Sequence, residues 1–300
     1  MRADEIGETG PKADWPEPAR ALAPGLYFIA TPIGAARDIT LRALDILASA
    51  DVLVAEDTRT LRHLMAIHAV RLGDRPVLAY HDHNGEAVRP HLLRLIGEGR
   101  SVAYASDAGT PLVADPGYQL ARAVIDAGLL VISAPGPSAV LAALTVSGLP
   151  TDRFLFAGFA PPAAGARAKF LAELAVIPAT VVLYESPKRI SRMLSEMAES
   201  FGADRLAAVC RELTKRFEEV SRGTLGTLAA QFADRAVKGE IVVLVDRRRG
   251  ERVSVEMMED ALRRAMQEQS MKDAVSDVAA ALGLPRRDVY RAALRLGAAR

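Results

Sequence analysis

Residues 100–117 read RSVAYASDAGTPLVADPG, and the rest of the chain is best interpreted outward from them. The apolar residues 102–105 predict a buried strand, and a helical pattern begins directly after Gly117. Residues 106–116 therefore form a loop at the carboxyl end of that strand, where open α/β sheets bind ligands. Gly109 lets a ligand approach the backbone, and Asp107 accepts hydrogen bonds. The composition suits equally an ordinary turn in which Asp115 caps the next helix.

Length and composition narrow the class of protein. The 300 residues, half of them hydrophobic, suffice for two αβ domains and a small appendage. The net charge of +1 argues neither for nor against a nucleic-acid partner. Cys210 is the single cysteine, which excludes a disulfide framework and fits a buried strand residue in a reducing cytoplasm. No apolar run is long enough to span a membrane and the start of the chain does not resemble a signal peptide, so we expect a soluble cytoplasmic protein without membrane partners.

Strands and helices alternate in strict rotation from residue 26 onward. The expected strands are 26–30, 52–55, 77–80, 102–105 and 129–133, each followed by a polar loop and a helix. Five such units predict a parallel sheet with helices on both faces, in a domain that spans 25–149. Residues 1–24 contain four prolines and few large apolar groups, so we interpret them as a disordered tail.

The rotation breaks around residues 148–150, where we place a domain boundary. The second domain, 150–248, begins with the strand FLFAGF. Further strands are expected at 180–184, 206–210 and 241–245, with an edge strand over 218–224 and a helix over 225–236. Two consecutive strands with a short connection imply a hairpin, so this sheet is predicted to be mixed.

Residues 251–300 carry no strand signal and are predicted to be helical. Ser270 and Asp273 form a capping box for a helix to Leu282, and Pro285 begins a second helix that reaches Leu296. This arrangement resembles a helix-turn-helix. The second helix is either a surface that contacts phosphates or the solvated face of a packing bundle. Its basic residues are Arg286, Arg287, Arg291 and Arg295.

The loops read together resemble one family. They are TPIGAARDIT (31–40), EDTR (56–59), HDHNGE (81–86), SDAGTPLVADPG (106–117), APGPSAV (134–140), YESPKR (184–189) and RELTKRFEE (211–219). In this order they are similar to the tetrapyrrole-methylase superfamily and, within it, to RsmI-type enzymes that methylate the ribose 2′-hydroxyl of a cytidine in 16S ribosomal RNA. The resemblance implies the α/β class with two αβα domains, the class III methyltransferase fold. It also implies a homodimer that acts on 16S rRNA or the small ribosomal subunit.

The cofactor implied by the resemblance is S-adenosylmethionine, held bent in the cleft between the two αβ domains. No GxGxxG loop is present or expected. Matching positions in both domains should line the pocket. They are Pro32, Gly34, Asp107, Ala108, Gly109, Thr110, Ser138, Ala139, Phe156, Leu183 and Tyr184. Tyr184 is equally compatible with a core position.

Methyl transfer to a ribose hydroxyl needs positioning and benefits from a base. Candidates for the catalytic base at strand ends are Glu56, Lys188, Glu212 and Lys215, with Asp57 and Glu185 as further carboxylates. The same residues are compatible with ion pairs that hold loops, such as Glu56 with Arg59 or Glu212 with Lys215. The arginines expected to bind the RNA substrate lie in both domains and the tail. They are Arg59, Arg189, Arg211, Arg216, Arg286, Arg287 and Arg291.

His81 and His83 invite a metal site, but no third ligand is near in sequence and the reaction has no use for one, so no metal is predicted. Two other functions stay open. One is methylation of a tetrapyrrole such as a precorrin, which would not require the arginine-bearing tail. The other is a non-catalytic RNA-binding assembly factor on the same fold, which uptake of S-adenosylmethionine would separate from both enzymes.

Overall fold

The computed structural model describes residues 21–114, 116–247, 255–282 and 284–298. The chain divides into two compact units, one up to Arg247 and one from Arg248, and each is described by itself. The predicted disordered tail lies almost entirely outside the described residues, as does Asp115.

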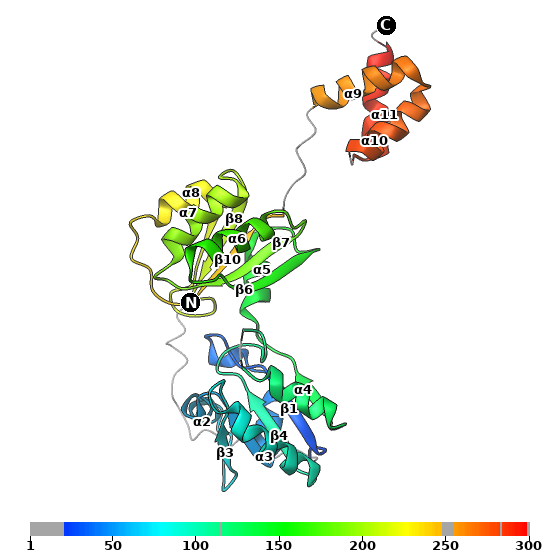
Figure 1. Ribbon diagram of the computed structural model, residues 1–300. Coiled ribbons are helices and arrows are strands. Elements are labelled where there is room, and N and C mark those ends of the chain that lie inside the picture. The colour runs from blue at the N-terminus through cyan, green and yellow to red at the C-terminus, as the bar shows by residue number, and fades with distance from the viewer. Residues whose placement is uncertain (1–20, 115, 248–254, 283, 299–300) are drawn as a thin grey trace. The chain divides into compact units, whose positions relative to one another are not determined.

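The first unit contains two sheets, each with its own helices (Figure 1). The first sheet is parallel throughout, as the strict rotation predicts, and its strand order is β3-β2-β4-β1-β5. Its strands are β1 (Gly25–Ile29), β2 (Val52–Ala55), β3 (Val77–Ala79), β4 (Ser101–Ala105) and β5 (Val131–Ala134). The helices between them are η1 (Ala36–Asp38), α1 (Leu41–Ser49), α2 (Thr58–Ile67), α3 (Gly85–Gly97) and α4 (Tyr118–Asp126), and α5 (Ala139–Ser147) follows β5.

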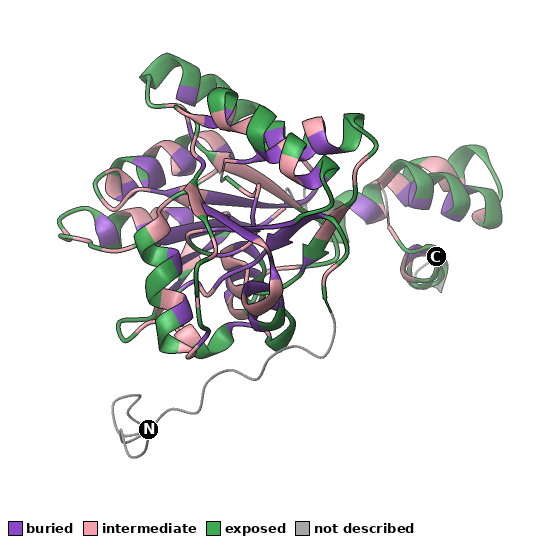
Figure 2. Ribbon diagram, turned by 90° about the horizontal axis from the view of Figure 1, so that it is seen from below, coloured by how far each residue is buried: buried purple, intermediate pink, exposed green. Residues whose placement is uncertain are grey.

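Strand alternation sends successive side chains to opposite faces of the first sheet. Tyr27 and Ile29 pack under α1 and α2, whereas Leu26 and Phe28 pack with α3 and α4. The central strand β4 is buried along its whole length, and Figure 2 shows the strands in purple beneath helices whose outer faces are green. Because helices bury both faces of this sheet, its strands are continuous apolar runs in the sequence.

The second sheet is mixed, in the order β6-β7-β10-β8-β9, which confirms the predicted class of fold. Strands β6 and β7 are parallel, whereas β10 runs antiparallel to both β7 and β8, and β8 and β9 form the expected hairpin. The strands are β6 (Phe154–Phe159), β7 (Thr180–Glu185), β8 (Leu206–Arg211), β9 (Glu219–Thr224) and β10 (Ile241–Val245). The helices are α6 (Ala164–Ala175), α7 (Ile190–Phe201) and α8 (Leu225–Phe232).

Helix α5 joins the two domains because it packs on the second sheet. Val140 and Leu144 lie against Val182, Ala208 and other residues of β7, β8 and β10. Helices α6, α7 and α8 cover the opposite face of that sheet. Both faces of the second sheet are therefore covered, one by its own helices and one by a helix of the first domain.

Several element ends differ from the sequence expectation. Helix α8 stops at Phe232 rather than 236, and Arg235 beyond it forms an ion pair with Glu219. Helix α4, by contrast, begins directly after Gly117 as predicted, and Gly117 at its N-cap has a φ of 119° and no side-chain cap. Strand β5 begins at Val131 because Leu129 still closes the preceding helix by bonding to Val124.

The second unit is a bundle of α9 (Val255–Glu268), α10 (Met271–Leu282) and α11 (Arg286–Ala298). Its core contains Leu262, Val275 and Val289. Ser270 caps α10, since its Oγ lies 3.3 Å from the Asp273 amide and 2.6 Å from the Asp273 carboxylate. None of the described helices is long and apolar enough to cross a membrane.

Candidate functional site

Three loops of the first domain meet at the carboxyl ends of β1, β4 and β5. Thr31 and Gly109 exchange both backbone hydrogen bonds at 3.0 Å, so the loop after β4 pairs with the loop after β1. The Thr31 hydroxyl donates to the Ser106 carbonyl at 2.9 Å, and the Thr110 hydroxyl donates to the Pro137 carbonyl at 2.9 Å. These bonds join all three loops into one rigid rim.

Gly109 is required by this rim. Its φ of +82° lies in the left-handed region, and a Cβ atom there would approach Ile33 Cγ2 to 3.2 Å. Gly34 faces a different constraint, because a Cβ atom would lie 2.5 Å from Lys215 Cγ and 3.0 Å from the Leu213 carbonyl. The loop between β8 and β9 thus packs directly on the loop after β1, and Ala35 donates its amide to Thr214 Oγ1 at 3.0 Å.

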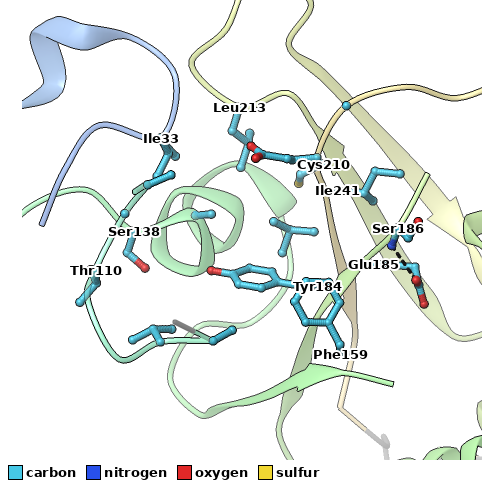
Figure 3. A pocket seen from close by; sticks show the side chains of 18 of the residues that line it. Ile33, Thr110, Ser138, Phe159, Tyr184, Glu185, Ser186, Cys210, Leu213 and Ile241 are labelled. Carbon is cyan, nitrogen blue, oxygen red and sulfur yellow. Dashed lines mark hydrogen bonds between the residues drawn. The ribbon is translucent and has the colours of Figure 1, made fainter. Parts of the chain in front are cut away.

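A cavity of about 370 Å³ lies between this rim and the second domain (Figure 3). Its volume falls within the range of small-molecule and cofactor sites. The first domain contributes Ile33, Ala108, Gly109, Thr110, Val113, Ala114, Ser138 and Ala139. The second domain contributes Phe159, Glu185, Ser186, Pro187, Tyr184, Cys210, Leu213, Gly239, Glu240, Ile241 and Val242.

Aromatic side chains form one wall of this cavity. The Tyr184 ring lies 4.8 Å from that of Phe156 and 5.6 Å from that of Phe159, centroid to centroid. In Figure 3 the Tyr184 phenol extends across the cavity towards Ser138 and Thr110. Burial raises the pKa of Tyr184, and burial raises the pKa of Cys210 to about 11, so both stay protonated at neutral pH. Tyr184 and Cys210 therefore present no charge to the cavity.

These features fit S-adenosylmethionine, the cofactor that the resemblance implies. A mostly apolar cavity with a few convergent polar groups is typical of nucleoside-containing ligands. Gly109 leaves space where a side chain would reach Ile33, so a ligand can approach the backbone there. The hydroxyls of Ser138 and Thr110 border the same space.

The predicted cofactor residues divide into two groups. The following line the cavity: Ala108, Gly109, Thr110, Ser138, Ala139 and Tyr184. Others do not line it, namely Pro32, Gly34, Asp107, Phe156 and Leu183. Leu183 is fully buried under α6 and α7, because alternation along β7 turns it away from Tyr184. Phe156 packs against the Tyr184 ring without lining the cavity itself.

Sequence reasoning missed most of the second-domain wall. Glu185, Ser186 and Pro187 belong to the YESPKR motif, which signalled a strand end and was assigned to RNA binding and base chemistry. Ile241 and Val242 carry no local signal, because they lie at the beginning of an antiparallel strand that only the topology brings to this edge.

Glu56 lies in an acidic group at the ends of β2 and β4. Burial, Asp107 and Asp82 raise its pKa, although His81 acts in the opposite direction. Burial also raises the pKa of Asp107, which accepts the Asp57 amide at 3.0 Å. Arg59, predicted as a partner of Glu56, pairs with Asp57 at 2.7 Å instead. Glu56 is thus an exposed carboxylate with a raised pKa, and it follows the strand next to the one that carries the cavity rim.

Lys215 is held by two carboxylates. Its Nζ lies 2.9 Å from Glu212 and 2.8 Å from Glu240, and these bonds raise its pKa although burial opposes them. Correspondingly, the hydrogen bond from Lys215 lowers the pKa of Glu212. In this arrangement Lys215 is an ammonium and Glu212 a weak base.

Two of the predicted RNA-binding arginines of the second domain, Arg189 and Arg211, are engaged in ion pairs. Arg189 holds the fully buried carboxylate of Glu185 at 2.9 and 3.0 Å and donates to the Ala160 carbonyl. Arg211 pairs with Glu219 at 3.0 Å, and Arg235 and Arg211 lower the Glu219 pKa to about 2.

Other predicted positions are open to solvent. Lys188 and Arg216 are exposed, and the Arg216 guanidinium lies over the Phe217 ring. In the helical bundle Arg286 and Arg287 border a groove with Lys272 and Tyr290. Asp288 pairs with Arg291 and also lies 3.8 Å from Arg287. Nowhere in the described ranges do three or more His, Cys, Asp or Glu side chains gather in a way that would hold a metal ion.

Comparison with known families and proteins matches both units. A model described as tetrapyrrole (corrin/porphyrin) methylases covers residues 25–229, and one described as the RsmI C-terminal HTH domain covers 253–297. A protein of Mesorhizobium japonicum named ribosomal RNA small subunit methyltransferase I is 52% identical over 76% of this chain and 77% of its own. A protein of Halalkalibacterium halodurans with the same name is 38% identical over 88% of this chain and 93% of its own.

Solved structures of similar fold are more distant in sequence. A cobalt precorrin-4 methyltransferase of cobalamin biosynthesis superposes with a TM-score of 0.56 at 21% identity, covering 74% of this chain and 94% of its own. A uroporphyrin-III C-methyltransferase from Thermus thermophilus gives 0.52 at 22% identity, covering 73% and 93%. At this identity the likeness concerns the fold alone.

Proposed function

The chain belongs to the tetrapyrrole methylase family, and we propose that within this family it is the enzyme that methylates 16S ribosomal RNA of the small subunit. It is an S-adenosylmethionine-dependent methyltransferase. The observation that carries the proposal is the cavity between the two domains, whose rim is built from the same loops that carry the resemblance. The Halalkalibacterium halodurans relative named for ribosomal RNA matches 88% of this chain, which is more than the first unit contains, and the RsmI C-terminal model matches the second unit; both findings favour RNA over a tetrapyrrole substrate.

S-adenosylmethionine, when bound, supplies a methyl group on a positively charged sulfonium, and transfer to a hydroxyl oxygen releases the hydroxyl proton and leaves a neutral thioether. The chain has to orient the two partners and receive the proton. The rim around Gly109 and the aromatic wall at Tyr184 are suited to orientation, because hydrogen bonds between the loops fix the first and ring packing fixes the second.

Glu56 is the proposed proton acceptor among the four predicted candidates. Burial, Asp107 and Asp82 raise its pKa, whereas Lys215 and Glu212 neutralise each other. Glu56 and Lys188 are both exposed, but only Glu56 is a carboxylate within an acidic group. A carboxylate acts as a base in its ionised form, so kcat falls as pH drops through its pKa. We expect Glu56→Gln to reduce kcat by about 10²- to 10⁴-fold.

The pH profile tests this role. Because Asp82 raises the pKa of Glu56, Asp82→Asn should move the acid limb of kcat at saturating RNA to lower pH. An unchanged acid limb together with a modest effect of Glu56→Gln would assign the proton to another group or to water.

The site on RNA is proposed to be the ribose 2′-hydroxyl of a cytidine, as the resemblance implies, and the enzyme is proposed to act as a homodimer in the cytoplasm. We assign cofactor binding to residues 25–149, closure of the pocket to 150–248 and RNA binding to 251–300. Mass spectrometry of 16S rRNA from cells with and without the gene tests the reaction. Loss of one 2′-O-methylcytidine is expected, and identical ribose methylation in both would refute it.

Calorimetric titration with S-adenosylmethionine separates the enzyme from a non-catalytic assembly factor on the same fold. The enzyme is expected to bind the cofactor, with a stoichiometry of one per chain. Intact RNA binding without cofactor binding would favour the assembly factor instead.

A further inference from the structure

The first domain has a second cavity, of about 490 Å³, on the same edge of the parallel sheet as the cofactor cavity. It lies between the end of β3 with the first turn of α3 and the start of α4. The residues that matter are Tyr80, His81, Asp82, Arg89 and Tyr118. None of them lines the cofactor cavity, and its size again suits a small ligand.

Arg89 is left without a partner in this cavity. Its Nε is buried and makes no hydrogen bond, and none of the ion pairs among the described residues includes it. Other arginines of the same domain are paired, such as Arg94 with Glu98 and Arg122 with Asp126. Because buried polar groups are normally satisfied, an unpaired guanidinium in a cavity indicates an anionic or polar ligand.

His81 adds a second unsatisfied group on the same wall. Its Nδ1 is buried without a partner, whereas its backbone amide is held by Asn84 at 2.8 Å. The backbone is therefore positioned and the ring is left available for a ligand.

Glu56 lines neither cavity, but it follows β2, which lies in the sheet between β3, whose end borders the second cavity, and β4, whose loop forms the cofactor rim. His81 and Asp82 act electrostatically on Glu56, as does Asp107, which directly precedes the cofactor rim. The Tyr80 amide donates to the Ala55 carbonyl at 2.9 Å, so the second cavity is tied to the strand that ends at Glu56. A ligand that extends from this cavity along the sheet edge towards the cofactor rim therefore passes the end of β2, which Glu56 follows.

The lining matches one unpaired ribonucleotide. A guanidinium binds phosphate, and the 62% exposed Tyr118 ring offers a face on which a base can stack. The Asp82 carboxylate accepts hydrogen bonds from ribose hydroxyls or from an exocyclic amine. Sequence-specific readers of RNA take up splayed, unpaired nucleotides in this way.

We propose that this cavity binds the ribonucleotide that accepts the methyl group, with its phosphate at Arg89, its base against Tyr118 and its ribose towards Glu56. This inference rests on the proposed function, because it names the place of the RNA substrate. The full-length protein binds RNA through this cavity in addition to any contact of the helical bundle.

The experiment compares Arg89→Ala and Tyr118→Ala with the control variants Arg94→Ala and Arg122→Ala, whose arginines form surface ion pairs in the same domain. Calorimetry with S-adenosylmethionine should give the same affinity for all five proteins, which shows that the fold and the cofactor cavity are intact. The RNA probe is a fluorescent single-stranded oligoribonucleotide of mixed sequence, measured with cofactor present. Methyl transfer to 16S rRNA is measured in parallel.

Arg89→Ala should weaken oligoribonucleotide binding and raise KM for rRNA by about tenfold to a hundredfold, the loss expected for a hydrogen bond to a charged group. Tyr118→Ala should have an effect in the same direction, and the controls should stay within twofold of wild type. Equal binding and equal KM in Arg89→Ala and its controls would overturn the inference while leaving the proposed function standing. Oligoribonucleotide binding that depends on Arg89 without any methyl transfer would support the cavity and refute the proposed function. Failure of the wild-type protein to bind the probe would overturn the inference.

Discussion

Replacing Arg189 by alanine distinguishes a structural arginine from one that binds RNA. The Arg189 guanidinium contacts both oxygens of Glu185, at 2.9 and 3.0 Å, and the Glu185 side chain is 0% exposed. Removing one partner of a buried pair costs about 3–5 kcal/mol, because the remaining charge stays buried and unpaired. At about 2–4 °C per kcal/mol for a domain of this size, the melting temperature of the first unit should fall by roughly 6–20 °C.

The assay is differential scanning calorimetry of the full-length protein, with Lys188→Ala as a matched control. Lys188 is the exposed neighbour in the same motif, so its removal should change the free energy of unfolding by no more than about 0.5 kcal/mol. This prediction would be refuted if Arg189→Ala had the melting temperature of the wild-type protein and only weakened RNA binding. The ion pair would then contribute nothing to stability, and the sequence prediction that Arg189 binds RNA would be correct.

Three further predictions concern the cofactor cavity, the helical bundle and the second sheet. Gly34→Ala should displace the loop at Lys215 and Leu213 and reduce S-adenosylmethionine affinity in calorimetry. The control Gly165→Ala, whose new Cβ would meet no atom within 4 Å, should leave this affinity unchanged. Equal affinities of the two variants would show that the loop adapts freely. Deleting residues 251–300 should leave cofactor affinity unchanged and lower the slope of log RNA affinity against log salt by roughly 0.7 for each phosphate that the bundle neutralises, and an unchanged slope would make the bundle a packing element. Glu219, with its pKa lowered to about 2 by Arg235 and Arg211, stabilises the fold above its unfolded pKa of about 4.3, and this contribution disappears as pH falls towards 2. Glu219→Gln should therefore cost about 2–3 kcal/mol at pH 7 and little at pH 2, as measured by thermal unfolding across pH; a pH-independent cost would exclude this linkage.

The amino-acid sequence by itself determined the class of fold and the position of the ligand-binding loops. Apolar periodicity depends on neighbours within a few residues, so strands such as 241–245 were predicted with the boundaries that the structure has. Gly109 was singled out for close approach to a ligand, and it occupies the left-handed region on the cavity rim. This role could be predicted because it depends only on the place of Gly109 in a loop at the carboxyl end of a parallel strand.

Tertiary structure alone decided which charged groups are available for chemistry. Arg189, Arg211 and Lys215 all follow strand ends, and the sequence left open both RNA binding and ion pairing, such as Glu212 with Lys215. The structure pairs Arg189 with Glu185, Arg211 with Glu219, and Lys215 with both Glu212 and Glu240. Glu240 reaches Lys215 from 25 residues away. Which distant carboxylate pairs with a given cation depends on strand order and on burial, and neither property is encoded in the spacing of residues along the chain.

The two cavities, too, were determined partly by the sequence and partly by tertiary structure alone. The sequence located the rim because its motifs are contiguous, whereas Ile241 and Val242 reach the cofactor cavity only through antiparallel pairing of β10 with β7. Arg89 was indistinguishable in sequence from the other arginines of its domain, and only packing left its Nε buried and without a hydrogen-bond partner among the described residues. A contiguous motif predicts the local contacts of its loop, whereas long-range packing decides which residues face that loop across a cavity.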